Sequence, residues 1–324
     1  MKTAIIGTNG LLGGAFQRHC LALGMQESVD LLSLDLPDFD VTSRLFSLDT
    51  LYGFQPDVIV NLAGIPMIDW LEKKPNTART VHVQGTVNMR EAAKRTGALL
   101  VHFSCAEVFG QTADVASEDD GDITDAAVSQ AKHPAGYSAF CETDVPEPVS
   151  VYARTKLDSE RAASEAPRHL IVRTGMLFGR VGKHSSGNIV ETLLNALRRP
   201  ENVRVIDDWQ MSPTWSDDLA RAVFSLVECG ATGLYHVANS GVATPLEIAR
   251  EIVRLTGVKR EFAPISSAEY GSVAPHAKYT VLDTSKYDAL PNVPKLPTWQ
   301  QALESYLASR SSFRIDPASG FRNF

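Results

Sequence analysis

The sequence predicts an α/β protein built on a doubly wound parallel sheet, with a smaller C-terminal α/β domain. Two observations predict this class. In the first half of the chain, short apolar segments alternate with segments of helical period, and a glycine-rich turn follows the first apolar segment. Strands that are joined through helices pair in parallel, by right-handed crossovers. The 324 residues, 44% of them hydrophobic, suffice for one large domain or two unequal ones.

The order of the elements follows from these patterns. Short apolar runs predict strands, and spacings of three and four between apolar residues predict helices. Strands are expected at 4–6, 29–34, 57–61, 98–104 and 169–174, with helices at 11–23, 77–96 and 150–166. Later elements are expected at 190–198, 203–206, 217–229, 234–237, 245–255 and 298–308.

Composition divides the chain further. Residues 111–148 are rich in Asp, Glu, Ser, Gly and Pro, which predicts a long surface excursion, and residues 309–324 show no period, which predicts a tail. We expect residues 1–173, joined by 217–240, to form the sheet domain. The smaller domain, which is expected to bind the substrate, takes residues 174–216 and 241–308.

Charge and cysteine content narrow the class of ligand. The chain has 31 Lys and Arg against 38 Asp and Glu, a net charge of −7, which argues against nucleic acid or an anionic membrane as partner. No run approaches the ~18 apolar residues of a membrane span, and glycines interrupt any signal peptide. Four cysteines without a CxxC pair predict reduced thiols in a cytoplasm and no metal site. We therefore expect a small-molecule ligand.

A glycine-rich turn is the first motif that carries chemistry. Gly7-Thr8-Asn9-Gly10-Leu11-Leu12-Gly13 lies between the first predicted strand and the first predicted helix. In Rossmann-type dinucleotide sites such glycines permit a tight turn, a close approach of backbone to pyrophosphate and close packing of helix on sheet. The motif therefore predicts that this run binds NAD or NADP. An ordinary strand-to-helix turn is the alternative.

Asp35 lies 22 residues beyond Gly13, at the end of the second predicted strand. A carboxylate at this position accepts hydrogen bonds from the adenosine ribose hydroxyls and repels a 2′-phosphate. Asp35 therefore favours NAD over NADP. A capping or turn aspartate is the alternative.

Tyr152 and Lys156 form the second motif, YxxxK. Residues four apart share one face of a helix, so the phenol and the ammonium group can enter one pocket. Carbonyl reduction needs a hydride and a proton, and a phenol with a pKa near 10 is a poor match for neutral pH. The charge of Lys156 is expected to lower the pKa of Tyr152. A lysine that lies along an amphipathic helix is the alternative.

These residues resemble the extended short-chain dehydrogenases/reductases and, within them, the dTDP-4-dehydrorhamnose reductase-like family. The resemblance covers about nine-tenths of the chain. Beyond the two motifs it is carried by residues 34–42, 56–64, Asp69 with Glu72, 142–144, 173–174, 205–208 and 212–214.

The resemblance implies an NAD- or NADP-dependent reductase of a nucleotide-linked 4-keto-6-deoxy sugar, and it allows a homodimer. Tyr152 would donate the proton, Lys156 would tune it and hold the nicotinamide ribose, and Cys105 would stand at the position of a Ser or Thr donor. Further cofactor contacts are implied for Tyr152 itself and for Asp40, Val41, Leu62, Ala63, Gly64 and Ser104. Substrate contacts are implied for Asp69, Glu107, Met176, Ser212 and Thr214.

The chain departs from the family pattern on the substrate side. Cys105 is a weak donor, and we leave open a handicapped catalytic residue, a changed chemistry or a buried small side chain. Ala106 replaces an aspartate, which counts against a dehydratase. His82 replaces an asparagine, and Met176 replaces a tryptophan. These changes keep two alternatives open: a weak or inactive NAD(P)-binding regulatory subunit, and a sugar-nucleotide epimerase.

Two tryptophans fall beside the expected substrate side. Trp209 and Trp215 flank the stretch 212–214. They could line the substrate cleft, and packing at a domain junction is the alternative.

Overall fold

A six-stranded parallel sheet forms the centre of the structure, a computed structural model that describes residues 1–110, 139–182, 187–198 and 203–310. The strand order is β10-β5-β4-β3-β1-β2, and every neighbouring pair is parallel. The bounds are β1 (Thr3–Ile6), β2 (Leu31–Leu34), β3 (Val58–Asn61), β4 (Leu99–Cys105), β5 (His169–Thr174) and β10 (Gly233–His236). The predicted doubly wound sheet is confirmed.

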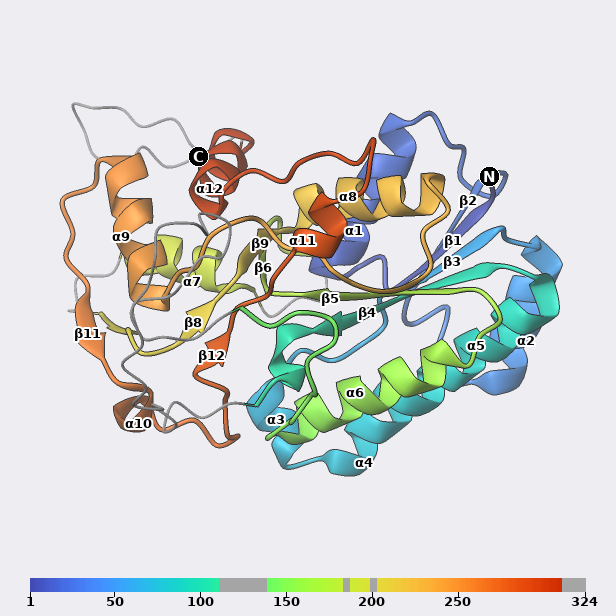
Figure 1. The fold of residues 1–324 in the computed structure, drawn as a ribbon, viewed down its shortest axis with the longest axis horizontal. Coiled ribbons are helices and arrows are strands. Elements are labelled where there is room, and N and C mark those ends of the chain that lie inside the picture. The colour runs from blue at the N-terminus through green and yellow to red at the C-terminus, as the bar shows by residue number, and fades with distance from the viewer. Residues whose placement is uncertain (111–138, 183–186, 199–202, 311–324) are drawn as a thin grey trace, which may run out of the picture.

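Helices cover both faces of this sheet (Figure 1). On one face lie α1 (Leu11–Ala22) and α8 (Ser216–Glu228), and on the other lie α2 (Arg44–Phe54), α5 (Gly85–Thr96) and α6 (Val151–Ser164). Alternate strand residues serve the two layers, so that Ile5 packs with Phe16 and Phe224, whereas Ile6 packs with Met89. Because both faces are buried, the strands read as continuous apolar runs in the sequence.

The second half of the chain builds on the carboxyl end of β5. Strand β6 (Met176–Phe178) follows β5 directly and pairs with β9 (Pro213–Trp215). A separate core there contains Phe178, Ile252, Trp299 and Tyr306. The other elements of this half of the chain are α7 (Ile189–Ala196), β7 (Arg204–Ile206), β8 (Gln210–Met211), α9 (Pro245–Thr256), β11 (Ala263–Ile265), α10 (Ser267–Tyr270), β12 (Tyr279–Thr280), α11 (Ser285–Asp288) and α12 (Trp299–Ala308).

Some elements differ from the sequence-based expectation. The helix expected at 77–96 begins as α4 (Pro75–Ala78), widens into a π-helical turn at Arg79–Gln84 and continues as α5. Helix α2 was not predicted, because its exposed face carries Leu45 and Phe46 and blurs the helical period. A further short helix, α3 (Ile68–Glu72), follows β3. No helix in the described ranges is long and apolar enough to cross a membrane.

The described end of the surface excursion expected at 111–148 contains no helix and is exposed or half-buried except at Phe140. Residues 111–138 lie outside the described residues. Phe140 is buried, pairs with Leu282 and stacks on Phe109 with ring centroids 4.2 Å apart. An aromatic side chain in a polar stretch gains free energy by burial, and here a strand-like partner satisfies its backbone. Of the tail, residues 311–324 are likewise outside the described part, and Arg310 pairs with Glu191.

Gly13 allows α1 to pack directly on the turn that precedes it. A Cβ atom at Gly13 would lie 2.0 Å from the carbonyl oxygen of Gly7, which belongs to the backbone and cannot rotate away. At Gly53, in α2, a Cβ atom would meet no atom within 4 Å. The two glycines therefore offer a matched pair.

Gly13→Ala is expected to lower the free energy of unfolding by about 1–3 kcal/mol, because the added methyl overpacks a close backbone contact. Gly53→Ala is expected to raise it by up to about 1 kcal/mol, because alanine is the better helix former. Chemical denaturation of both variants beside the unsubstituted chain measures the difference. Equal stabilities of the two variants would contradict this view of the turn.

Candidate active site

The glycine-rich turn connects β1 to α1 at the carboxyl edge of the sheet. Gly7 has φ of +92°, in the left-handed region, and its N–H donates to the carbonyl oxygen of Leu34, 2.8 Å away. The turn is closed by Gly10 N–H, which donates to Gly7 O at 3.2 Å. Helix α1 thus begins with its free N–H groups at this edge, where an anionic group binds favourably.

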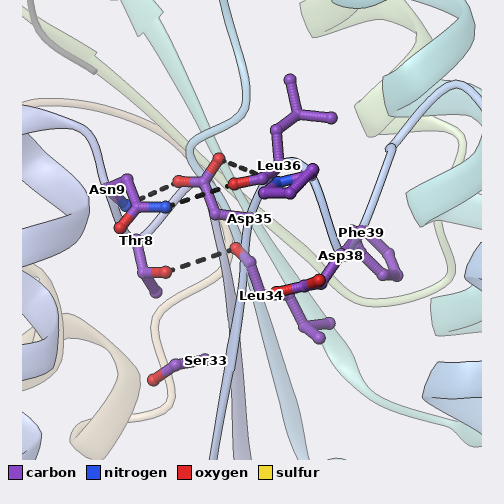
Figure 2. A pocket seen from close by; sticks show the side chains of 9 residues that line it. Thr8, Asn9, Ser33, Leu34, Asp35, Leu36, Asp38 and Phe39 are labelled. Carbon is purple, nitrogen blue, oxygen red and sulfur yellow. Dashed lines mark hydrogen bonds between the residues drawn. The ribbon is translucent and has the colours of Figure 1, made fainter. Parts of the chain in front are cut away.

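A polar pocket of about 400 Å³ lies beside this turn and is lined by residues of both the turn and the end of β2 (Figure 2). Asp35 is at its centre: its carboxylate accepts from the backbone N–H of Asn9 and, at 2.7 Å, from that of Leu36. Asp35 therefore has the turn role that the sequence left open. Its carboxylate also lines the pocket, as does Asp38.

The segment after this pocket is fixed to α5. The Asp40 carboxylate accepts from the N–H and the hydroxyl of Thr42, at 2.9 and 2.7 Å. The Asn88 amide donates to the carbonyl oxygen of Val41 at 2.9 Å. A Cβ atom at Gly85 would lie 2.9 Å from a methyl carbon of Val41, so α5 approaches closely only because residue 85 is glycine.

His82 joins the loop after β3 to helix α6. This side chain is 1% exposed, and its Nε2 atom accepts from the backbone N–H of Ile65 at 3.0 Å. The proton of the neutral ring therefore lies on Nδ1, which donates to the Thr155 hydroxyl at 2.9 Å. Burial, aided by the charge of Lys156, lowers the pKa of His82 to about 3. The residues Leu62, Ala63 and Gly64 lie in the loop that this contact fixes.

A second buried chain of hydrogen bonds joins the same loop to α6. Asn61 accepts from Ala63 N–H at 3.3 Å and donates to Nδ1 of His102 at 3.3 Å. The Ser159 hydroxyl donates to the carbonyl oxygen of Lys156 at 2.6 Å, so it accepts from Nε2 of His102 at 2.9 Å. Burial keeps the pKa of His102 well below its ordinary value. Both histidines are therefore neutral connectors.

Tyr152 and Lys156 lie on the first turns of α6, which Ser150 caps by accepting from Ala153 N–H at 3.1 Å. Lys156 is buried, its ammonium group donates to the carbonyl oxygen of Phe103, and burial lowers its pKa. The structure brings this pair together with Cys105, because β4 ends directly beneath α6.

The Tyr152 phenol and the Cys105 thiol lie close enough that each changes the pKa of the other. Burial, with smaller contributions from Cys105 and Glu107, raises the pKa of Tyr152 well above its ordinary value. The sequence led us to expect a lowering by Lys156, but here burial decides the direction. The phenol is therefore neutral, which is the form that donates a proton.

Cys105 is a partly buried thiol whose pKa burial raises to about 12. It is therefore a neutral thiol, able to donate only weakly. Its neighbour Ser104 is buried within the sheet, and the Ser104 hydroxyl has no hydrogen-bond partner among the described residues. Successive side chains of a strand point to opposite faces, which separates these two residues.

The residues expected on the substrate side are held by backbone groups. Ser212 accepts from Leu282 N–H at 3.1 Å, and the Thr214 hydroxyl donates to Ser212 O at 3.2 Å. Both residues are buried. Asp69 accepts from Ala274 N–H at 2.9 Å, and Met176 packs against the second core. Substrate contact by these side chains stays a prediction.

Two aromatic rings, those of Trp209 and His276, pack against each other. Trp209 and His276 stack with centroids 4.7 Å apart and planes inclined by 32°. The indole Nε1 of Trp209 is buried and finds no acceptor within the described ranges. Trp215 packs against Tyr306 in the second core, which agrees with the alternative of packing at a domain junction.

His102, Ser159 and Thr155 were not singled out from the sequence, although a histidine inside the apolar run 98–104 was a signal for the first of them.

Comparison with known proteins finds relatives of similar sequence and similar fold. A dTDP-4-dehydrorhamnose reductase of Mycobacterium tuberculosis is 31% identical over 313 residues, which cover 95% of this chain and 93% of that protein. The structure of a dTDP-4-dehydrorhamnose reductase from Bacillus anthracis in complex with NADP matches with a TM-score of 0.80 and 25% identity, over 96% of this chain and 100% of that one. A reductase structure from Clostridium acetobutylicum matches with a TM-score of 0.79 and 27% identity, over 95% and 99%.

The predicted family is confirmed by a family model. The model described as the RmlD substrate binding domain matches residues 1–312. This match spans the glycine-rich turn, the Tyr152–Lys156 pair and the second core. The chain belongs to the RmlD substrate-binding domain family.

Proposed function

We propose that this chain is an NAD(P)-dependent reductase of a nucleotide-linked 4-keto-6-deoxy sugar. Relatives named dTDP-4-dehydrorhamnose reductase, which match over more than nine-tenths of both chains, support this function. The observation that carries it is the neutral Tyr152 phenol, which lies near Cys105 and on helix α6, the helix that His82 joins to the loop after β3. We place substrate selection in residues 174–216 and 241–308, the part of the chain that includes the stacked rings of Trp209 and His276.

The residues fit a nicotinamide dinucleotide. The turn around Gly7 offers the N-terminus of α1 to a pyrophosphate, and the pocket beside Asp35 has the polar lining that an adenosine ribose needs. When bound, the reduced dinucleotide supplies the hydride. Tyr152 then donates its proton to the carbonyl oxygen of the sugar, and the Cys105 thiol donates a second, weaker hydrogen bond to that oxygen. Lys156 lies four residues after Tyr152 on α6, and its charge would stabilise the phenolate that forms.

We propose that NAD is the preferred dinucleotide and that the protein is located in the cytoplasm. The Asp35 carboxylate lies in the wall of the pocket, and a 2′-phosphate there would meet its charge. A cytoplasmic location agrees with four cysteines that are all free thiols. A homodimer stays a prediction of the family resemblance.

Tyr152→Phe is expected to lower kcat by ~100-fold or more, because positioned acid catalysis is worth ~10²–10⁴-fold. The dinucleotide should still bind, because the glycine-rich turn is unchanged and phenylalanine keeps the ring that packs edge-on against His82, with centroids 5.7 Å apart. The assay follows oxidation of NADH or NADPH with dTDP-4-dehydrorhamnose, beside dinucleotide binding by fluorescence. A variant as active as the unsubstituted chain would remove Tyr152 from the mechanism.

Cys105→Ser is expected to raise kcat by up to about fivefold, because a hydroxyl is the stronger donor and one improved hydrogen bond is worth about 1 kcal/mol. Cys229→Ser, at an exposed cysteine, is the control and should change nothing. If the Cys105 thiol instead marks a regulatory subunit, neither the unsubstituted chain nor Cys105→Ser will reduce the sugar, although both bind the dinucleotide.

Asp35→Asn is expected to raise the ratio of kcat/KM for NADPH to that for NADH by about tenfold, which corresponds to about 1.4 kcal/mol of removed repulsion. Asparagine keeps an acceptor for the N–H of Asn9, but it loses the second acceptor, which serves the N–H of Leu36, together with the charge. Asp49→Asn, on the exposed side of α2, is the matched control. A ratio that does not move in Asp35→Asn would mean that the pocket does not hold the adenosine ribose.

A further inference from the structure

A buried ion pair begins one helical turn after Lys156 and has no part in the proposed reduction. The guanidinium group of Arg173, in β5, donates from Nε and Nη2 to the two carboxylate oxygens of Glu160 on α6, at 2.9 and 2.8 Å. The side chains of Arg173 and Glu160 are only 4% and 7% exposed. This pair therefore carries the full cost of removing two charges from water, unlike the ion pairs of the protein surface.

Glu160 shares the buried face of α6 with the YxxxK motif. It follows Lys156 by four residues and Tyr152 by eight, and residues four apart share one face of a helix. Lys156 and Glu160 are both buried where α6 packs on β4 and β5 (Figure 1). The Lys156 ammonium group donates to the carbonyl oxygen of Phe103 in β4, and Arg173 lies in the neighbouring strand. Two cations and one anion therefore occupy one buried layer between helix and sheet.

The stability of the fold does not by itself account for this ion pair. Apolar residues of similar size in place of a buried ion pair are often as stabilising as the pair, or more so, because they lose no hydration of charge. The Nη1 atom of Arg173 is buried without a hydrogen-bond partner in the described part of the chain, which adds to the cost. A second buried cation, Lys156, makes this region still less favourable for an arginine. The pair therefore has a role that apolar side chains could not fill.

One carboxylate acts on the charge of Lys156. Burial lowers the pKa of this lysine, whereas Cys105 and Glu160 raise it. Cys105 is a neutral thiol with a pKa of about 12, so it supplies no negative charge near neutral pH. Glu160 remains as the anion that favours the ammonium form.

The other described titratable groups around Lys156 supply no such charge. His82 in the π-helical turn and His102 on β4 are neutral, and the charge of Lys156 helps to lower the pKa of both. Tyr152 on α6 is a neutral phenol. Glu107, in the turn after β4, raises the pKa of Tyr152 and is not among the groups that change that of Lys156.

We propose that Glu160 is a positioning residue that keeps the Lys156 ammonium group charged, and that Arg173 holds the Glu160 carboxylate in place for this role. The two cations and one anion leave a single excess positive charge in the buried layer. A phenolate on Tyr152 would balance that charge, so the cluster favours loss of the phenol proton to the substrate. The benefit for catalysis rests on the proposed function, whereas the charge of Lys156 does not.

The test measures the pKa of Lys156 directly. The full-length chain is labelled with ¹³C and ¹⁵N at lysine, NMR follows the side-chain signals against pH without any ligand, and Lys156→Arg identifies the signal. Glu160→Gln removes the charge and keeps the shape, so we expect the pKa of Lys156 to fall by about 1–3 pH units, the effect of a nearby opposite charge. Glu160→Asp, which keeps the charge, should leave this pKa close to that of the unsubstituted chain.

A double variant separates charge from packing. Glu160→Met combined with Arg173→Met removes both charges and fills their space with apolar side chains, a change that buried ion pairs often tolerate. We expect thermal stability close to that of the unsubstituted chain and a pKa of Lys156 that stays low, because no anion remains beside it. This variant also supplies the measurement if the unpaired arginine prevents Glu160→Gln from folding.

Glu91→Gln is the matched control. The Glu91 carboxylate also accepts from Nε and Nη2 of an arginine, Arg44, at 2.9 and 2.6 Å, but this pair lies at the surface of α5. It should leave the pKa of Lys156 unchanged. A pKa of Lys156 that does not move in Glu160→Gln, or that recovers in the double variant, would overturn the proposal, since a merely structural pair predicts both.

Reduction of dTDP-4-dehydrorhamnose, measured against pH in the same variants, connects this charge to the proposed function. Because Lys156 loses its proton at lower pH in Glu160→Gln, the alkaline fall of kcat should move to lower pH by about the same amount as the pKa. A lowered pKa with an unchanged kcat profile would overturn the positioning role. Absence of reduction by the unsubstituted chain would instead overturn the proposed function, while the NMR result would still decide whether Glu160 keeps Lys156 charged.

Discussion

The site depends on the contact that neutral His82 makes between the loop after β3 and helix α6. The loop follows β3, and helix α6 packs on the neighbouring strand β4. Among the described residues, no backbone-to-backbone hydrogen bond joins the loop to the helix. His82 accepts from Ile65 and donates to Thr155, and a protonated ring could not do both, because its Nε2–H would face another N–H. The cost of burying a charge therefore keeps the ring neutral and the geometry unique.

Burial also determines the chemistry of the groups that this contact positions. It raises the pKa of Tyr152 and of Cys105, and it lowers the pKa of Lys156. Two neutral groups thus lie near each other, where the proposed reaction would develop negative charge on the carbonyl oxygen of the substrate. The lysine ammonium, held by Phe103 O, is the charge that in this proposal favours a phenolate once the proton has left. A weak thiol donor can be tolerated here because the phenol carries the proton.

The parts of this account that the sequence predicts are those encoded locally. The glycine spacing from Gly7 to Gly13, the continuous apolar strands and the Tyr152–Lys156 spacing each specify a local geometry, and the fold class and family follow from them. What depends on a distant partner could not be predicted. Phe140 looked like part of a surface loop because its partner, Leu282, is 142 residues away. Ser212 and Thr214 are predicted substrate contacts, and the sequence does not reveal the backbone groups that bond to their hydroxyls.

The protonation state of His82 is the most direct test of the central contact. Two-dimensional ¹H–¹⁵N NMR of protein labelled at histidine distinguishes a protonated from an unprotonated ring nitrogen. The account predicts a proton on Nδ1, none on Nε2, and no change in the ring between about pH 5 and about pH 8, because the pKa lies at about 3. A ring that titrates near its ordinary pKa of 6.5, or one that carries its proton on Nε2, would contradict it.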